Sequence, residues 1–543
     1  MMRALPFSIL FLFLFFGFQT PSSSLFEQAE EMFLNGPVKG DNSEWGKADS
    51  IFLSLYVEKG RLQPKEEILS VIYRISMRQS PGTYHADIEK QSEDLKWIEE
   101  ILRDYPDLKN NETDLYVQLL NLKYRIELLQ NQTGSLENLK KLAENYSGSK
   151  SVETSTISAV FETIAKHFHS QRNFPDALYY GNKSLNNLNS DWTFKRISML
   201  QWVGGAYYNA DKIDSSLYMM EVAYAELKNF PNETQSIFQR RSQLAFNIGM
   251  IFQGKTGDYP ESGYYLKEAI DWEIKAHGEE SPTLITYYSL LADTYFILKD
   301  IQKAEFYSLK AYSLANDVLK IESVYLKSLP SMSLSRVYVQ QENYEGARKL
   351  MNQVLEESLD FFGKDDKFTT QVYIDLAFIE KEAGNFKEAE KYYLLAVDSS
   401  RATGRIYSIS SAYDSLIDMY TETENYSEAL YYAEQSEDLI NKHLENDFKV
   451  KAISGLRLAK IYLGLNEVNQ AKNHLDRAED ILSLHHNTDL LDTEALSIRN
   501  SILFKEYQLT QNREALEKAF ENIEELIEII IKGKTEYNYQ NSK

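Results

Sequence analysis

One pattern constrains this sequence more than any other: a pair of amphipathic helices recurs at a near-constant interval along most of the chain. The residue that opens the second helix is aromatic or aliphatic, and successive copies lie 39, 46, 42, 43, 42, 40 and 42 residues apart. These opening residues are Phe174, Ile213, Tyr259, Ile301, Tyr344, Phe386, Tyr426 and Val468. Three positions later every copy has a small residue, namely Ala177, Ser216, Ser262, Ala304, Ala347, Ala389, Ala429 and Ala471. Self-similarity at a fixed period predicts a stack of repeats in which each unit buries its apolar face against its neighbours.

The copy at His277–Ala311 shows why each repeat should be a pair of antiparallel helices. Its first helix has a stripe of mostly large residues, formed by Tyr288, Leu291, Ala292 and Tyr295. Its second helix has a stripe of small residues, formed by Ala304, Ser308 and Ala311. These spacings place each stripe on one face of a helix. Since large side chains that face small ones let two helices approach closely, the sequence predicts an all-α solenoid of antiparallel helix pairs.

Two copies depart from the pattern. An aromatic residue precedes the turn in most first helices, at Phe168, Tyr207, Phe252, Tyr295, Tyr338, Tyr420 and Tyr462. The sixth pair has Glu380 at this position instead, so we expect that pair to pack differently or slightly more loosely. The longest interval, 46 residues, includes one extra residue in the turn GKTGDYP.

The composition excludes several classes of function. The 543-residue chain contains no cysteine, which rules out disulfides, thiolate metal sites and a cysteine nucleophile. Its formal net charge is −23, whereas nucleic-acid binding requires clustered Lys and Arg. The loop with His485 and His486 has no metal-site spacing, and neither a glycine-rich phosphate loop nor an isolated acid pair is present. We therefore expect no enzyme activity, no metal, no cofactor and no nucleic-acid partner.

The first 24 residues have the order of charge and hydrophobicity of a secretory signal peptide. Arg3 precedes the apolar run Leu5–Phe18, which is short for a membrane span, and the small residues Ser22 and Ser24 would precede a cut before Leu25. An uncleaved N-terminal anchor is the alternative. No later stretch is long and apolar enough to cross a membrane, so cleavage would leave no membrane span. We expect an exported protein, periplasmic or secreted.

The sequence divides into five parts on these grounds. They are a signal peptide (1–24), degenerate helical repeats that form an N-terminal cap (25–157), about eight long repeats (158–484), a degenerate C-terminal capping repeat (485–531) and a polar tail (532–543).

The repeats resemble tetratricopeptide (TPR) repeats. The segment LADTYFILKDIQKAEFYSLKA has a small residue four positions before an aromatic residue, and then an apolar–x–x–Ala motif that opens the second helix. The period exceeds the TPR period of about 34 residues, and in this it resembles the kinesin-light-chain type. The connectors AHGEESPTL and FFGKDDKFTT are similar to the Gly–acidic–(His)–Pro connector of that type. The resemblance covers about residues 158–531.

The TPR resemblance implies a right-handed superhelix whose concave groove is lined by the first helix of each pair. The residues at the matching positions are Gln201, Phe246, Met250, Ser289, Asp293, Met332, Arg336, Phe378, Asp414, Asp418 and Lys460. This lining mixes apolar and acidic residues, and it lacks the Lys, Arg and Asn cluster with which chaperone-binding TPR proteins clamp a terminal carboxylate. It suits an extended or helical peptide with apolar anchors and some basic residues.

A second resemblance concerns the whole order of segments. A signal peptide, long repeats and the ending Glu506–Lys543 resemble the N-terminal half of secreted bacterial TPR–CHAT proteins, in which a caspase-like domain with a His–Cys pair follows the repeats. This chain has no cysteine, so no peptidase activity is implied. Our main hypothesis is an exported TPR scaffold that binds another protein through the concave groove. The alternatives are a regulatory partner or truncated relative of a TPR–CHAT peptidase, and an extracytoplasmic sensor ectodomain if the N-terminal segment stays uncleaved.

Overall fold

The computed structural model describes residues 25–32, 45–57, 62–78, 87–132, 134–188, 193–231, 233–484 and 489–540. Helices dominate these ranges, and no strand occurs within them. The proposed signal peptide (1–24) and the loop with His485 and His486 lie outside the described residues. The predicted all-α solenoid of antiparallel helix pairs is confirmed, because within each of the two compact units described below the second helices pack against their own partners and against the first helices that follow them.

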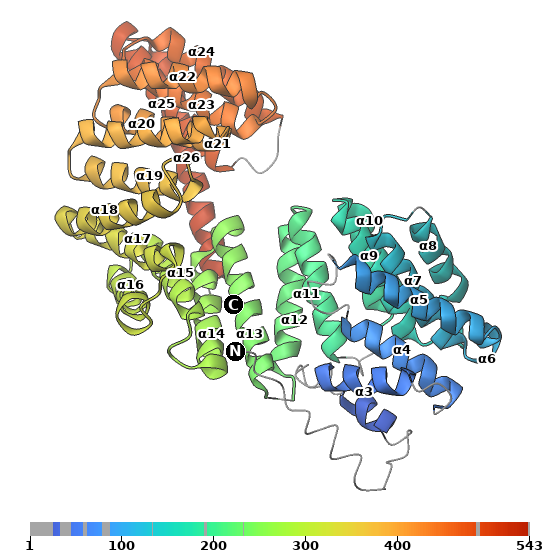
Figure 1. The fold of residues 1–543 in the computed structure, drawn as a ribbon. Helices are drawn as coiled ribbons and strands as arrows, with labels where there is room; N and C mark the ends of the chain where they lie inside the picture. Colours follow the sequence, from blue (N-terminus) through green and yellow to red (C-terminus); the bar gives the residue numbers. More distant parts are fainter. Residues whose placement is uncertain are drawn as a thin grey trace. The chain divides into compact units, whose positions relative to one another are not determined.

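The chain forms two compact units that divide between Asp300 and Ile301 (Figure 1). The first unit contains α3 (Trp45–Val57), α4 (Pro64–Arg78), α5 (Ile88–Asp104), α6 (Leu108–Asn111), α7 (Thr113–Leu129), α8 (Ser135–Tyr146), α9 (Thr154–Ser170), α10 (Phe174–Asn186), α11 (Thr193–Asn209), α12 (Ile213–Lys228), α13 (Gln235–Ile251), the π-helix η3 (Phe252–Thr256), α14 (Tyr259–His277) and α15 (Thr283–Ile297). The division falls inside the repeat His277–Ala311, whose first helix is α15.

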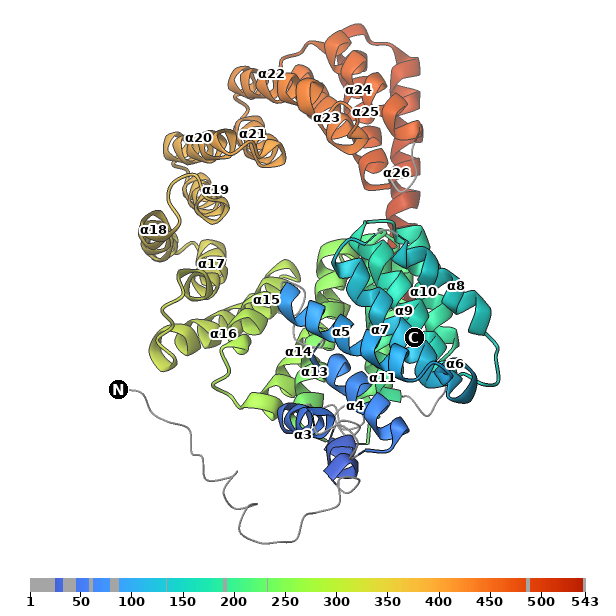
Figure 2. The same cartoon turned by 45° about the vertical axis from the view of Figure 1, so that its right-hand side comes forward.

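The second unit begins with the other helix of that repeat. It contains α16 (Ile301–Ser313), the π-helix η4 (Leu314–Val318), α17 (Val324–Gln340), α18 (Tyr344–Phe361), α19 (Lys367–Glu382), α20 (Phe386–Ala402), α21 (Ile406–Glu422), α22 (Tyr426–His443), α23 (Phe448–Gly464), α24 (Val468–Ser483), α25 (Asp489–Thr510) and α26 (Arg513–Gln540). Within this unit, Figure 2 shows α17, α19, α21 and α23 along one side of a curved stack and α18, α20 and α22 along the other. We call the first set the inner row and the second set the outer row.

The repeat period places the helix boundaries closely. All eight second helices, α10 through α24 in even numbers, begin at the opening residue that the period predicts. The small residue three positions later is fully buried in every copy: Ala177, Ser216, Ser262, Ala304, Ala347, Ala389, Ala429 and Ala471 each have 0% exposure. A small side chain at this position lets the two helices of a pair cross closely, as the sequence indicates.

The ends of the array differ in detail from the sequence division. Helix α9 begins at Thr154, four residues before the expected start of the clear repeats. Helix α26 continues to Gln540, so the backbone is helical through most of the expected polar tail. A short helix, α6, follows α5 directly in this N-terminal region.

The same turn joins the two helices of most pairs. The carbonyl that ends the first helix accepts a hydrogen bond from the N–H five residues later, as in Tyr338 O from Asn343 N at 2.8 Å and Tyr420 O from Asn425 N at 2.8 Å. The residue before the donor has a positive φ, which is 59° at Glu342 and 56° at Glu424. This is the Schellman arrangement, in which a left-handed residue ends one helix.

The longest interval contains the extra residue that the sequence predicts. There the donor lies six residues after the acceptor, because Asp258 N bonds to Phe252 O at 3.1 Å. The π-helix η3 takes up the added residue.

Stacked aromatic rings connect the two helices of several pairs. The aromatic residue near the end of the first helix lies nearly parallel to a ring on the second helix in four pairs: Phe168–Tyr180 (8°), Phe252–Tyr265 (13°), Tyr420–Tyr432 (8°) and Tyr462–His474 (17°). In these four pairs the aromatic ring therefore serves the packing between the two helices of the pair.

Candidate peptide-binding face

The inner row of the second unit carries charged side chains at every junction between neighbouring helices. The pairs are Arg336–Asp375 (α17 to α19, N···O 3.7 Å), Lys381–Glu422 (α19 to α21, 2.6 Å), Asp418–Arg457 (α21 to α23, 3.1 Å) and Lys460–Glu494 (α23 to α25). We call this series the inner ionic ladder. Ion pairs at a surface contribute only about 0–1 kcal/mol each, so the ladder matters more as a pattern of charge than as a source of stability.

Arg457 is the most connected member of the ladder. Its guanidinium donates from Nε and Nη2 to the two carboxylate oxygens of Asp418, at 3.1 Å each, and its Nη1 lies 3.2 Å from Oδ1 of Asp414. One arginine thus joins two carboxylates that are a helical turn apart on α21.

The two carboxylates differ in their environment. Burial raises the pKa of Asp414 to about 6, against the opposing effect of Arg457, and the charge of Asp418 raises it further. The Asp414 side chain is 29% exposed and that of Asp418 is 51% exposed. Two acids one turn apart and one cation leave a surplus of negative charge on this part of the inner row at neutral pH.

The first unit has a different lining on its first helices. The rings of Phe246 on α13 and Tyr287 on α15 stack with centroids 4.5 Å apart and planes 19° apart. Gln253 Nε2 donates to Thr294 Oγ1 at 3.3 Å, so a polar contact also joins η3 to α15. Tyr287 and Thr294 are themselves buried, so Phe246 and Gln253 are the partly exposed members of these two contacts.

The eleven residues predicted to face the groove fall in both units. Seven are partly exposed: Gln201, Phe246, Met250, Asp293, Arg336, Phe378 and Asp414. Asp418 and Lys460 are exposed. Ser289 and Met332 are buried, at 3% and 7% exposure, and the Ser289 hydroxyl donates to Ile285 O of its own helix at 2.8 Å. These two side chains are therefore not accessible to a ligand, which corrects the prediction for Ser289 and Met332.

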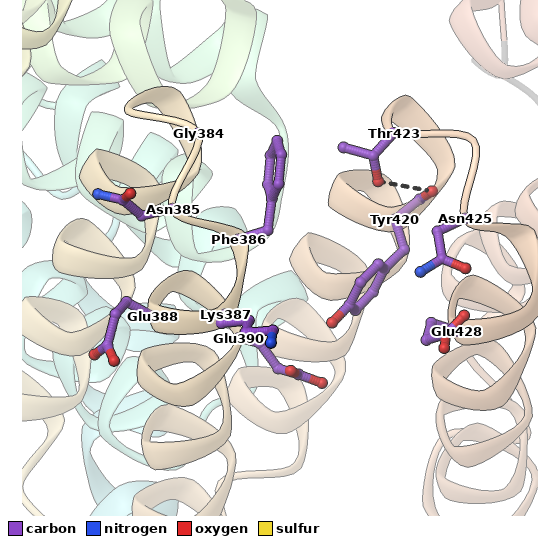
Figure 3. Close-up of a pocket in the computed structure, with 10 residues that line it drawn as sticks. All are labelled: Gly384, Asn385, Phe386, Lys387, Glu388, Glu390, Tyr420, Thr423, Asn425 and Glu428. Carbon is purple, nitrogen blue, oxygen red and sulfur yellow. Dashed lines mark hydrogen bonds between the residues drawn. The ribbon is translucent and has the colours of Figure 1, made fainter.

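A shallow cavity of about 700 Å³ lies at the turn edge of the second unit (Figure 3). Its lining comes from the α19–α20 turn and the start of α20, and from the end of α21 and the start of α22: Gly384, Asn385, Phe386, Lys387, Glu388, Glu390, Tyr420, Thr423, Asn425 and Glu428. Figure 3 shows the Phe386 ring standing opposite Tyr420 and Thr423 across the opening.

The polar groups of this cavity are largely engaged by the repeat itself. Tyr432 Oη donates to Glu390 Oε1 at 2.5 Å, and Lys391 Nζ lies 3.1 Å from Glu388 Oε2. Burial and the nearby Glu390 raise the pKa of Tyr420 to about 12, so its phenol stays protonated. None of the residues predicted for the groove lies in this cavity. The recurring Asn–aromatic step at helix starts, as in Asn385-Phe386 and Asn425-Tyr426, was the signal for a repeated turn edge.

The described residues offer no group of three or more His, Cys, Asp or Glu side chains placed to hold a metal ion. Within the same ranges, we find no helix with the length and hydropathy needed to span a bilayer.

Comparison with known proteins agrees with the repeat pattern. Residues 240–317 and 329–402 match the tetratricopeptide repeat family. No curated protein matches the sequence.

Several solved structures are similar in fold at low sequence identity. Apo RapI is 12% identical, covers 71% of this chain and 98% of its own, and has a TM-score of 0.47. A Pyrococcus horikoshii signal transduction ATPase with a tetratricopeptide repeat sensor is 17% identical, covers 89% of this chain and 74% of its own, and has a TM-score of 0.45. TPR-like repeats of a kinesin light chain candidate from Podosopora anserina are 16% identical, cover 39% of this chain and 97% of their own, and have a TM-score of 0.33. These weak likenesses say nothing about what this chain binds.

Proposed function

We propose that this chain, in which residues 240–317 and 329–402 are tetratricopeptide repeats, is an exported scaffold that binds another protein or peptide and carries out no catalysis itself. The observation that carries the proposal is the inner ionic ladder with its exposed members. Asp418 and Lys460 have side chains that are 51% and 45% exposed, on helices fixed by packing on their other faces.

A ligand for this face needs both apolar and positively charged groups along its length. Phe378 is partly exposed on α19, and the surplus of negative charge lies on α21 around Asp414 and Asp418. An extended or helical peptide with an apolar anchor and basic side chains complements this order of groups. Side chains mounted on packed helices lose little entropy on binding, which favours recognition by a rigid face.

The export part of the proposal is supported by the sequence of the first 24 residues. Arg3, the apolar run Leu5–Phe18 and the small residues that follow have the order of a cleaved leader. N-terminal sequencing of the protein from the extracytoplasmic fraction should give a start near Leu25. A start at Met1 in a membrane fraction would contradict export as a free protein.

The binding part can be tested with a matched pair of charge reversals. Lys460→Glu alters the inner ionic ladder, and Lys391→Glu makes the same change in the outer row, where Lys391 also pairs with a glutamate. Crosslinking of the native protein in its own fraction, followed by mass spectrometry, should identify a polypeptide partner. Lys460→Glu and Asp418→Lys should change its recovery, while Lys391→Glu should not.

Two results would count against the proposal. One is the absence of any polypeptide crosslink from protein shown to be folded by circular dichroism. The other is equal recovery of the partner with inner-row and outer-row variants, because the groove would then not be the binding face.

A further inference from the structure

Two exposed tyrosines occupy the same register on the second helices of neighbouring pairs in the first unit. Tyr218 on α12 is 64% exposed and Tyr264 on α14 is 51% exposed. Each lies five residues after the residue that opens its helix, Ile213 and Tyr259. Large aromatic side chains left in solvent at a repeated position are not explained by packing within the repeat.

Contacts beside these tyrosines hold α12 and α14 in register. Tyr265 Oη on α14 donates to Glu221 Oε1 on α12 at 3.0 Å. Tyr224 Oη on α12 donates to Glu268 Oε2 on α14 at 2.7 Å and accepts from Trp272 Nε1 at 2.8 Å. The exposed rings therefore stand on helices whose relative position is fixed by several hydrogen bonds.

Packing also orients one of the exposed rings. Tyr265 stacks on Phe252, with centroids 5.7 Å apart, and Tyr264 meets the Tyr265 ring edge-on at 5.1 Å and 78°. A ring held in this way loses little freedom when a ligand covers its face.

Each of the two tyrosines has a carboxylate three residues away on its own helix. Glu221 follows Tyr218 by three residues and Glu261 precedes Tyr264 by three, so each acid shares a helix face with its tyrosine. Burial, and then the charges of Asp258 and Glu221, raise the pKa of Glu261. Within the described part of the chain, neither Glu221 nor Glu261 forms an ion pair.

Aromatic faces beside carboxylates attract cations. An ammonium or guanidinium group over a tyrosine ring is attracted by the negative charge of the ring face. The chain itself shows such a contact at the same register on α10, where Lys183 Nζ lies 4.6 Å from the Tyr179 ring centroid. The net charge of −23 adds a general attraction for basic partners.

We propose that the face formed by Tyr218, Glu221, Glu261 and Tyr264, which we call the outer tyrosine face, binds a Lys- or Arg-rich peptide segment of a partner protein. The rings cover the cationic groups and the carboxylates neutralise them. This surface lies on second helices, so it is separate from the inner row and does not depend on the groove proposed above.

Fluorescence anisotropy with labelled heptalysine and heptaarginine, titrated with the full chain, tests this proposal. Binding should weaken as salt is raised. It should weaken by about tenfold in the double variant Tyr218→Ser/Tyr264→Ser, as expected for the loss of two ring contacts. Glu221→Gln/Glu261→Gln should weaken it to a similar degree. The four tested side chains and the two controls, Tyr325 and Lys391, are all partly or fully exposed, so the variants should fold.

Two control variants distinguish binding at the outer tyrosine face from nonspecific attraction by the negative charge of the whole chain. Tyr325→Ser removes a tyrosine of matched exposure, 51%, from the second unit, and Lys391→Glu changes a charge in the outer row, outside both proposed surfaces. Neither should reduce binding by the same factor as the Tyr218/Tyr264 variant. The proposal is overturned if the tyrosine double variant binds as tightly as the wild type. It is also overturned if the tyrosines change only the mass measured by sedimentation, because the face would then join two copies of this chain.

Discussion

Arg348 on α18 forms a bidentate ion pair with Glu380 on α19: Nε donates to Oε1 at 2.6 Å and Nη2 donates to Oε2 at 3.0 Å. Glu380 occupies the position where the other first helices have an aromatic residue, and it is only 5% exposed. Asn385, the residue that precedes α20, donates a third hydrogen bond to Glu380 Oε2 at 2.8 Å. From the sequence we expect the sixth pair, α19 and α20, to pack either differently or more loosely. It packs differently, with an ion pair in place of stacked rings.

Arg348→Met should destabilise the α18–α20 region by about 2–3 kcal/mol, since it leaves a buried carboxylate with one neutral donor. Amide hydrogen exchange across α18, α19 and α20 measures this loss locally, as suits an array whose repeats interact mainly with their neighbours. The double variant Arg348→Met/Glu380→Gln should recover most of the protection because no charge is then left buried. An equal loss in the single and double variants would show that the charge is not the cause.

The helix pairs and their contacts could be predicted from the sequence because the period itself is a physical constraint. Ala389 and its equivalents must be small for the two helices of a pair to cross closely. The small residue in each repeat therefore shows how the second helix is aligned against the first. The partner of Glu380 could not be predicted in the same way. Arg348 lies 32 residues away on a neighbouring pair, and no periodic pattern marks an ion pair that occurs once.

The candidate site was predicted less well than the fold. Ser289 and Met332 have the repeat register of groove residues, but both side chains are buried in the packing between helices. The outer tyrosine face could not be predicted, because the sequence does not tell an exposed tyrosine from a packed one. Tyr264 and Tyr265 are adjacent in the sequence, and only the structure shows that one stacks on Phe252 while the other is exposed.

Gly204 and Gly205 on α11 should respond in opposite ways to alanine. A Cβ on Gly204 would lie 2.8 Å from Met220 Cγ and 3.3 Å from Ser216 O, whereas a Cβ on Gly205 meets nothing within 4 Å. Gly204→Ala should cost about 1–3 kcal/mol through overpacking. Gly205→Ala should stabilise the helix by up to about 1 kcal/mol, because glycine is a poor helix former. Thermal unfolding followed by circular dichroism should show a lower melting temperature for Gly204→Ala and a higher one for Gly205→Ala. Two shifts in the same direction would contradict the described α11–α12 contact.

Glu342 ends α17 with a φ of 59°, a conformation that costs a residue with a side chain free energy. Glu342→Gly should therefore raise the stability of the α17–α18 pair by about 0.5–1 kcal/mol, since glycine adopts this region freely. Glu356→Gly, an exposed position inside α18, provides the matched control and should lower stability by about 1 kcal/mol. Exchange protection of α17 and α18 measures both effects, and a loss with Glu342→Gly would show that its side chain makes a contact that outweighs the backbone strain.

Asp414 and Glu380 should give the second unit opposite local responses to acid. Arg348 lowers the pKa of Glu380, so its pair stabilises α18–α19 above the ordinary glutamate pKa and is lost as the pH falls through the lowered value. Burial instead raises the pKa of Asp414 to about 6, above its unfolded value of about 3.9, so the folded state binds a proton first as the pH falls. Protection at α21 and α23 should accordingly rise by on the order of 1–2 kcal/mol between pH 7 and pH 5, while α18–α19 shows no such gain.

Asp414→Asn isolates this effect, because the amide keeps the shape and removes the titrating group. The variant should already have at pH 7 the α21–α23 protection that the wild type reaches only near pH 5, and its protection should then be flat over that range. Asp418 keeps its own hydrogen bonds to Arg457 at 3.1 Å, so the α21–α23 junction stays paired in the variant. If Asp414→Asn instead lowers protection at pH 7, the ion pair of the charged Asp414 carboxylate with Arg457 stabilises the junction by more than the burial of that carboxylate costs.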